Sequence, residues 1–206
     1  MISEIRSTEE HNIVIVYPKP DDPERAKRLE SVLTPALMQL EKDGTRFTVI
    51  EKISELGEND MSGKRVIFAI CLSEAGINIE YYRLLEFLRA NDSCLEGSVG
   101  GIIVDGASEL FTKSLARRMA FSANMAGCAF PGKPLVEATG SLGNFHVLSG
   151  ITGKPPYEVY KDQVAALLDK VIGMAYPGTG GTENGKIPKV LTVHASMRAT
   201  SNTLLL

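Results

Sequence analysis

Tryptophan is missing from this 206-residue chain, and cysteine occurs only three times. Cys71, Cys94 and Cys128 are widely spaced and never form a C-x-x-C pair, which argues against a disulfide framework or a structural zinc site. Apolar runs stay far below the roughly 20 residues that span a bilayer. The polar, acidic start, MISEIRSTEEHN, lacks the features of a signal or transit peptide. The net charge of −3 shows no basic excess of the kind that nucleic-acid binders carry. We therefore expect a cytoplasmic globular protein that binds no structural metal, no nucleic acid and no membrane.

Apolar residues that are present follow two alternating patterns. Short runs rich in β-branched residues predict five strands, at 12–17, 46–51, 65–71, 100–105 and 134–138. Segments with apolar residues at helical spacing predict helices at 22–44, 78–90, 110–126 and 156–176. In the first helix Asp22 is the expected N-cap, Pro23 stands at the first helical position, and Pro35 is expected to kink or split the helix.

Strands that alternate with helices are typical of a parallel sheet with right-handed crossovers. The sequence thus predicts an α/β protein with three layers: a doubly wound, five-stranded parallel sheet with helices on both faces. The connection ISELGENDMSG (53–63) is short and polar, so its helix should be abbreviated.

The texture of the sequence changes after Tyr176, and this sets the expected domain boundaries. The predicted order is a polar N-terminal segment (1–11), the α/β domain (12–177), a Pro/Gly/Thr linker (178–188) and an extra strand with its loop (189–206).

The extra strand, KVLTV, runs into the turn HASMRATSNT at 194–203. Hydroxyl groups, the Arg198 guanidinium and backbone N–H groups near a helix start form a plausible cradle for a phosphate. An ordinary N-cap cluster, with Ser201 or Asn202 as the cap, is an equally acceptable interpretation. The chain has neither G-x-x-x-x-G-K-[ST] nor G-x-G-x-x-G, which argues against nucleoside triphosphate and Rossmann dinucleotide sites.

The stretch KVLTVHASMRATSNT resembles the first strand and phosphate loop of flavodoxin-like NAD(P)H-dependent FMN reductases and quinone reductases. The order of elements over 12–176 resembles the same fold more loosely. The resemblance implies that FMN is the cofactor and NAD(P)H the reductant, with a small molecule as electron acceptor. It also implies phosphate contacts from Ser196, Arg198, Ser201, Asn202 and Thr203.

Two further loops correspond, in this resemblance, to those that flank the flavin ring. They are LSEAGIN (72–78) and DGASELF (105–111), with Ser73, Gly106 and Ala107 as the implied ring contacts. The resemblance implies no catalytic acid or base. The expected activity is hydride transfer from NAD(P)H to FMN and then to the acceptor.

The first strand of the complete domain departs from the family pattern. Its loop, YPKPDDPERAK (17–27), contains three prolines without N–H donors and adjacent acids where a phosphate would sit. We consider two explanations. Either the chain is a tandem protein whose second flavodoxin-like unit starts at 189, or the last strand joins the sheet of this chain or of a partner. The expected partner is accordingly a second copy or a following domain. The alternative function is a non-catalytic interaction or dimerisation module that has lost its own phosphate loop.

Other patterns are weaker. A phosphorelay receiver would need an acceptor Asp after the third strand, where the chain has Ile70, Cys71 and Leu72. A hydrolase based on Ser141 and His146 lacks the G-x-S-x-G elbow. Lys113, Arg117 and Arg118, one helical turn apart, are interpreted as a solvated face rather than a clamp for a nicotinamide phosphate.

Overall fold

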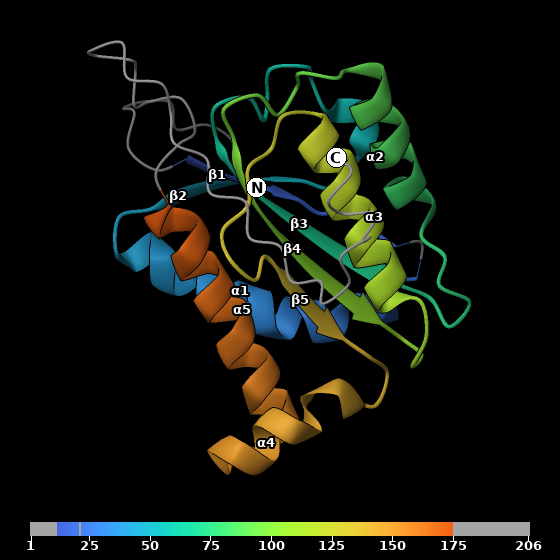
Figure 1. The fold of residues 1–206 in the computed structure, drawn as a ribbon, viewed down its shortest axis with the longest axis vertical. Helices are drawn as coiled ribbons and strands as arrows, with labels where there is room; N and C mark the ends of the chain where they lie inside the picture. Colours follow the sequence, from blue (N-terminus) through green and yellow to red (C-terminus); the bar gives the residue numbers. More distant parts are fainter. Residues whose placement is uncertain (1–11, 21, 175–206) are drawn as a thin grey trace, which may run out of the picture.

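The computed structural model describes residues 12–20 and 22–174, which form one parallel sheet between two helical layers (Figure 1). All strand pairs are parallel, in the order β2-β1-β3-β4-β5. The strands are β1 (Asn12–Val16), β2 (Arg46–Ile50), β3 (Arg65–Leu72), β4 (Val99–Gly106) and β5 (Leu135–Ala138). The predicted five-stranded, doubly wound parallel sheet is therefore confirmed.

The helices cover both faces of the sheet. Residues of α1 and α5 pack on one face, and residues of α2 and α3 pack on the other, so two apolar clusters sandwich the strands. The helical elements are η1 (Pro23–Arg25), α1 (Lys27–Lys42), η2 (Ile53–Glu55), α2 (Ile79–Ala90), α3 (Thr112–Met125), η3 (Gly143–Phe145), α4 (His146–Thr152) and α5 (Pro156–Gly173).

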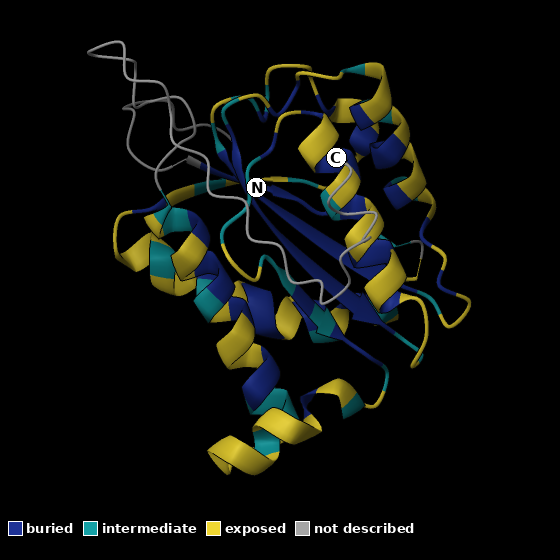
Figure 2. Ribbon diagram, viewed as in Figure 1, coloured by how far each residue is buried: buried dark blue, intermediate teal, exposed yellow. Residues whose placement is uncertain are grey.

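The middle strands are buried along their whole length (Figure 2). Every residue of β3 and of β4 is buried, as expected for continuous apolar strands covered on both faces. Gly101 shows how closely α5 approaches, because a Cβ on this glycine would lie 2.9 Å from a methyl carbon of Val171. By contrast, β2 is partly exposed at the edge of the described sheet.

Three details of the helices differ from the expectations or refine them. The predicted split at Pro35 does not occur, since α1 runs unbroken from Lys27 to Lys42 with its buried leucines and valine on either side of the proline. The break comes earlier, at Ala26, between the η1 turn capped by Asp22 and α1 itself. The short α4 lies between η3 and α5, where the sequence predicted no helix.

The connection between β2 and β3 contains only the three-residue η2, which confirms the abbreviated crossover. The linker and extra strand predicted at 178–188 and 189–206 lie outside the described residues, so these boundaries stay predictions.

Candidate functional site

The candidate site lies at the carboxyl ends of the strands. In an open parallel sheet, ligands bind where the chain connections leave adjacent strands in opposite directions. Here that point is between β1 and β3, because β1 connects to β2 on one side and β3 connects to β4 on the other. The loops that meet there are 17–26, 73–78 and 107–111, and the loop 139–142 after β5 lies next to them.

The loop between β1 and α1 has few backbone donors left for a ligand. The Tyr17 N–H donates to the Ile50 carbonyl at 2.8 Å, and the Lys19 N–H donates to the Glu51 carbonyl at 3.2 Å. Pro18, Pro20 and Pro23 have no N–H. Further along, the N–H groups of Glu24, Arg25 and Ala26 all bond within the turn. A phosphate cradle needs several free N–H groups, and this loop uses those described above for its own structure.

The cations of this loop are also paired with carboxylates, both of this loop and of its neighbours. Lys19 pairs with Glu51 at 3.1 Å, and Lys27 pairs with Glu24 at 2.6 Å. Arg25 contacts the carboxylates of Asp22 at 3.5 Å and Glu74 at 3.8 Å. With its cations neutralised, the loop offers no net positive field to a dianion. The described residues of this loop therefore do not fit the phosphate of FMN.

Ser73, one of the predicted ring contacts, shapes its own loop. Its hydroxyl accepts the Ile77 N–H at 3.1 Å, and its backbone exchanges bonds with Ile77 and Gly76. Asn78 closes the same loop as the N-cap of α2, accepting the Tyr81 N–H at 2.9 Å. The Asn78 amide also donates to the carbonyls of Pro18 at 3.0 Å and Cys71 at 2.9 Å, which ties the first loop to β3.

Gly106 and Ala107, the other predicted ring contacts, lie beside Ser73. Gly106 pairs with Leu72 in the register of β3 and β4, and the Ala107 N–H donates to the Leu72 carbonyl at 3.1 Å. The structure thus brings the three predicted residues together. Their backbone groups described here bond within the protein, so ring binding by these residues stays a prediction.

An apolar rim follows these two loops. Phe111 has a left-handed backbone, with φ of 75°, and its side chain is 48% exposed. Its ring lies against Gly76, since a Cβ on that glycine would come 2.6 Å from ring carbons. Ile77 and Leu110 are also exposed here, and a cavity of about 140 Å³ lies between Gly76, Phe111 and the start of α3. A strained, exposed aromatic at the switch point is typical of a contact surface.

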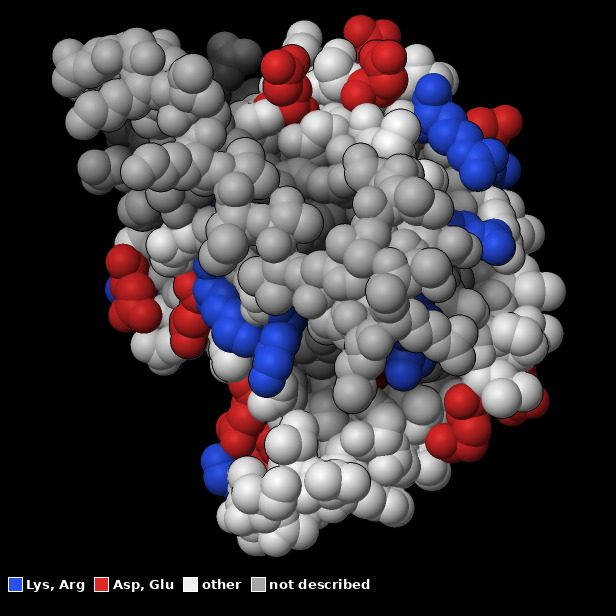
Figure 3. All heavy atoms as spheres, viewed as in Figure 1, with Lys and Arg blue, Asp and Glu red and all other residues white. Residues whose placement is uncertain are grey.

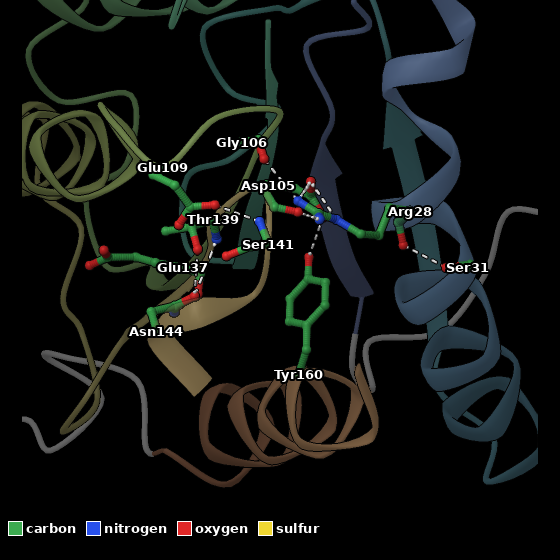
Figure 4. A network of polar contacts seen from close by, with 11 residues as sticks. Arg28, Ser31, Asp105, Gly106, Glu109, Glu137, Thr139, Ser141, Asn144 and Tyr160 are labelled. Carbon is green, nitrogen blue, oxygen red and sulfur yellow. Dashed lines mark hydrogen bonds and ion pairs between the residues drawn. The ribbon is translucent and has the colours of Figure 1, made fainter. Parts of the chain in front are cut away.

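The strongest polar feature of this edge is a network that sequence patterns did not predict (Figure 4). The Arg28 guanidinium donates to the Asp105 carboxylate at 2.7 Å from Nη2 and at 3.1 Å from Nε. It also donates to the carbonyls of Gly106 at 2.8 Å and Gly140 at 2.7 Å. The Tyr160 hydroxyl donates to the other Asp105 oxygen at 3.1 Å. One arginine therefore joins α1, β4, the loop after β5 and, through Asp105, α5.

The protonation of this network follows from its burial. Burial raises the pKa of Asp105, and hydrogen bonds from Arg28 and Tyr160 oppose that rise. Burial lowers the pKa of Arg28, but the bonds and charge of Asp105 more than compensate, so the pKa is raised overall. Burial and the Asp105 charge raise the pKa of the Tyr160 hydroxyl. The network is consequently an ion pair with a phenol donor, and most of its guanidinium donors are committed to the protein.

A second set of polar bonds orders the loop after β5. Glu109 accepts the Ser141 N–H at 2.6 Å, and this bond lowers the pKa of Glu109. Asn144 accepts from Thr139 and donates to the carbonyl of Glu137 on the edge strand. The Ser141 hydroxyl accepts the Gly143 N–H at 3.1 Å, and His146 is exposed at the start of α4.

Residues 12–20 and 22–174 contain neither a cluster of metal ligands nor a membrane-spanning helix. No three His, Cys, Asp or Glu side chains there are grouped to hold a metal ion. No helix in these ranges is long and apolar enough to cross a membrane. The predicted phosphate residues Ser196, Arg198, Ser201, Asn202 and Thr203 lie outside the described residues.

The strand order and helical layers define a flavodoxin-like fold, and the comparison with solved structures supports this class. A short-chain flavodoxin associated with a non-canonical PDU bacterial microcompartment matches with a TM-score of 0.52 and 13% identity, over 80% of this chain and 97% of that one. RosB, solved with 8-demethyl-8-formylriboflavin-5'-phosphate bound, matches with a TM-score of 0.53 and 11% identity, over 93% and 94%. Flavodoxin 1 from Bacillus cereus matches with a TM-score of 0.50 and 11% identity, over 77% and 97%. No protein-family model and no curated protein sequence matches the chain. At these identities the likeness is one of fold.

Proposed function

We propose that this chain works in flavin-dependent oxidoreduction, and that its flavodoxin-like domain takes part as a non-catalytic module without a phosphate site of its own. The observation that carries this proposal is the loop between β1 and α1. Among the described residues of this loop, the prolines, the internally bonded N–H groups and the paired cations do not fit a phosphate dianion. Asp22 and Glu24 add negative charge at the same place.

The flavin itself is then held, in this proposal, by the loop at 194–203. Ser196, Arg198, Ser201, Asn202 and Thr203 supply the phosphate contacts, as the resemblance to FMN reductases implies. The flavin supplies hydride chemistry when bound, with NAD(P)H as reductant and a small molecule as acceptor. The fold supports this choice, since solved structures of the same class include flavodoxins and a protein with a bound flavin phosphate.

The test compares the two loops directly by titrating FMN into the 206-residue chain and following flavin fluorescence. Arg198→Ala should weaken FMN binding by about one to two decades, because a charge-assisted bond contributes roughly 1.5–3 kcal/mol. Lys19→Ala and Arg25→Ala, the matched cation removals in the first loop, should leave the affinity unchanged. Riboflavin, which lacks the phosphate, should be nearly insensitive to Arg198→Ala.

The outcomes separate the parts of the proposal. If Lys19→Ala or Arg25→Ala weakens FMN binding as much as Arg198→Ala, the first loop does bind the phosphate and the module assignment is wrong. If Arg198→Ala changes nothing while FMN binds tightly, the second loop is not the phosphate site.

A second candidate function is a module with no flavin role at all, favoured by the commitment of Arg28 and of the first loop to internal bonds. A purified flavoprotein absorbs near about 450 nm, as an oxidised flavin does. A chain that is colourless and binds neither FMN nor riboflavin supports this second candidate over the first.

A further inference from the structure

Helix α3 presents two large apolar side chains to solvent. Phe121 is 68% exposed and Met125 is 66% exposed, although Leu115, Ala116, Met119 and other residues of the same helix are buried. The two exposed residues are four positions apart and therefore lie on one side of the helix. Exposed aromatic and methionine side chains are enriched at the centres of protein interfaces.

The same helix is basic. Lys113, Arg117 and Arg118 are its charged residues, and it contains no acid. None of these three forms an ion pair with another residue of the described ranges. The charges of Lys113 and Arg117 do act on Glu137, lowering a pKa that burial raises. In Figure 3, acidic side chains lie mostly toward the outline of this face, while basic ones also occur over its middle. We call Lys113, Arg117, Arg118, Phe121 and Met125 the α3 ridge.

A hollow lies on the same face of the sheet as α3, but over the strands β1 and β2 at the opposite edge. Because the crossover from β2 to β3 has only the η2 turn, no full helix covers this part of β1 and β2 in the described structure. A cavity of about 260 Å³ remains, which we call the β2 cavity. Its lining is mostly apolar on the strands and carries two acids and one lysine on the crossover: Val14, Thr48, Val49, Ile50, Glu55, Asp60 and Lys64. The crossover adds two more exposed carboxylates, Glu51 and Glu58.

Size and charge match between the two surfaces. An apolar cavity of about 150 Å³ holds a benzene molecule, so the β2 cavity has room for a phenyl ring. Of the four carboxylates of the crossover, Glu51 pairs with Lys19 and Glu55 pairs with Lys52, which leaves Glu58 and Asp60 against Lys64. The charged residues of the α3 ridge are all cationic. We propose that the α3 ridge of one copy of this chain docks in the β2 cavity of a second copy, with Phe121 in the hollow and Arg117 and Arg118 against the acidic rim.

Other occupants fit less well. A membrane surface needs an amphipathic helix with a free apolar face, and the apolar face of α3 is buried against the sheet. A nucleic acid would meet the carboxylates of a chain whose net charge is −3. A second copy supplies both the hollow and the opposite charge. The attraction between these oppositely charged surfaces also steers two copies toward each other as they associate.

The experiment is a charge-swap complementation followed by sedimentation velocity over a wide range of protein concentration. Wild type should self-associate. Phe121→Ala should weaken association about tenfold or more, as expected for a central aromatic anchor. Arg117→Glu/Arg118→Glu and Glu55→Lys/Glu58→Lys should each be monomeric alone, because like charges then face each other. An equimolar mixture of these two double variants should associate again, since each reversed surface meets its opposite.

Matched controls use exposed residues elsewhere. Met38→Ser removes an exposed apolar side chain from α1, and Arg89→Glu reverses a charge on α2, and both should associate like wild type. Circular dichroism shows that each variant is folded. A monomeric wild type overturns the proposal, as does association that the two double variants leave unchanged. Restored association in the mixture supports it, and failure of the mixture to associate overturns it.

Discussion

Replacing Arg28 by methionine should be among the most damaging substitutions that leave the apolar core untouched. The guanidinium is the main partner of Asp105, whose side chain is only 5% exposed, and it also satisfies the carbonyls of Gly106 and Gly140. Methionine keeps the aliphatic length but leaves a buried carboxylate with the Tyr160 hydroxyl as its remaining side-chain partner. Breaking a buried ion pair by removing one partner costs about 3–5 kcal/mol of unfolding free energy. Arg28 is a quarter exposed, so the lower part of that range is expected.

The loss should depend on pH, and the direction is diagnostic. Burial raises the pKa of Asp105, and in Arg28→Met the opposing guanidinium is gone. A carboxyl whose pKa is higher in the folded than in the unfolded chain binds its proton more tightly when folded. The stability penalty is therefore full above the raised pKa and shrinks as the pH falls through it toward the ordinary aspartate value of about 3.9.

Urea denaturation followed by circular dichroism at several pH values measures both effects. Lys154→Met is the matched control, because it breaks an exposed ion pair with Asp162 and should change stability by less than about 1 kcal/mol. Asp105→Asn/Arg28→Met should be more stable than Arg28→Met alone at neutral pH, since the uncompensated charge is absent. If Arg28→Met costs no more than the control, or if its cost does not change with pH, the network does not stabilise the fold as described.

Two further substitutions test the loops of the candidate site by the same denaturation assay. Gly76→Ala should lower the unfolding free energy by at least about 1 kcal/mol, because φ is +73° and the new Cβ meets the Phe111 ring. The control Gly44→Ala has a similar positive φ but open space around the Cβ, and it should cost less. Equal losses would show that the ring contact is unimportant. Asn78→Ala should lower the unfolding free energy by about 2–3 kcal/mol, because it removes the α2 cap and leaves two carbonyls without their amide donor. Asn78→Asp should recover only the contribution of the cap. Full recovery by Asn78→Asp would show that the bonds to Pro18 and Cys71 contribute nothing.

Part of the candidate site could be predicted from the sequence. The loops after β3 and β4 follow from strand ends, and a parallel sheet brings all strand ends of one kind to one edge. For that reason Ser73, Gly106 and Ala107 lie together, and their contact with a flavin ring stays a prediction. The prolines at 18, 20 and 23 likewise predicted a first loop without phosphate donors, and the structure shows where the loop's other donors go.

The Arg28 network could not be predicted in this way. Arg28 looks like an ordinary helical arginine, and Asp105 looks like a polar residue that ends an apolar strand. The two are 77 residues apart, and Tyr160 is another 55 beyond Asp105. No local spacing links residues at such separations, since their partnership depends on which helix covers which strand. Lys113, Arg117 and Arg118 were interpreted from the sequence as a solvated face, and the sequence does not show the hollow over β1 and β2.

The sequence alone determined the alternation of strands and helices, the parallel sheet and the shortened crossover, because hydrophobic periodicity and turn residues act over a few positions. It also determined that the first loop carries prolines and acids instead of phosphate donors. Tertiary structure decided the continuity of α1 through Pro35, the bonding of Asn78 to two separate segments and the burial of Asp105 against Arg28. Each of these depends on contacts between elements, and the free energy of those contacts exists only once the sheet has brought the elements together.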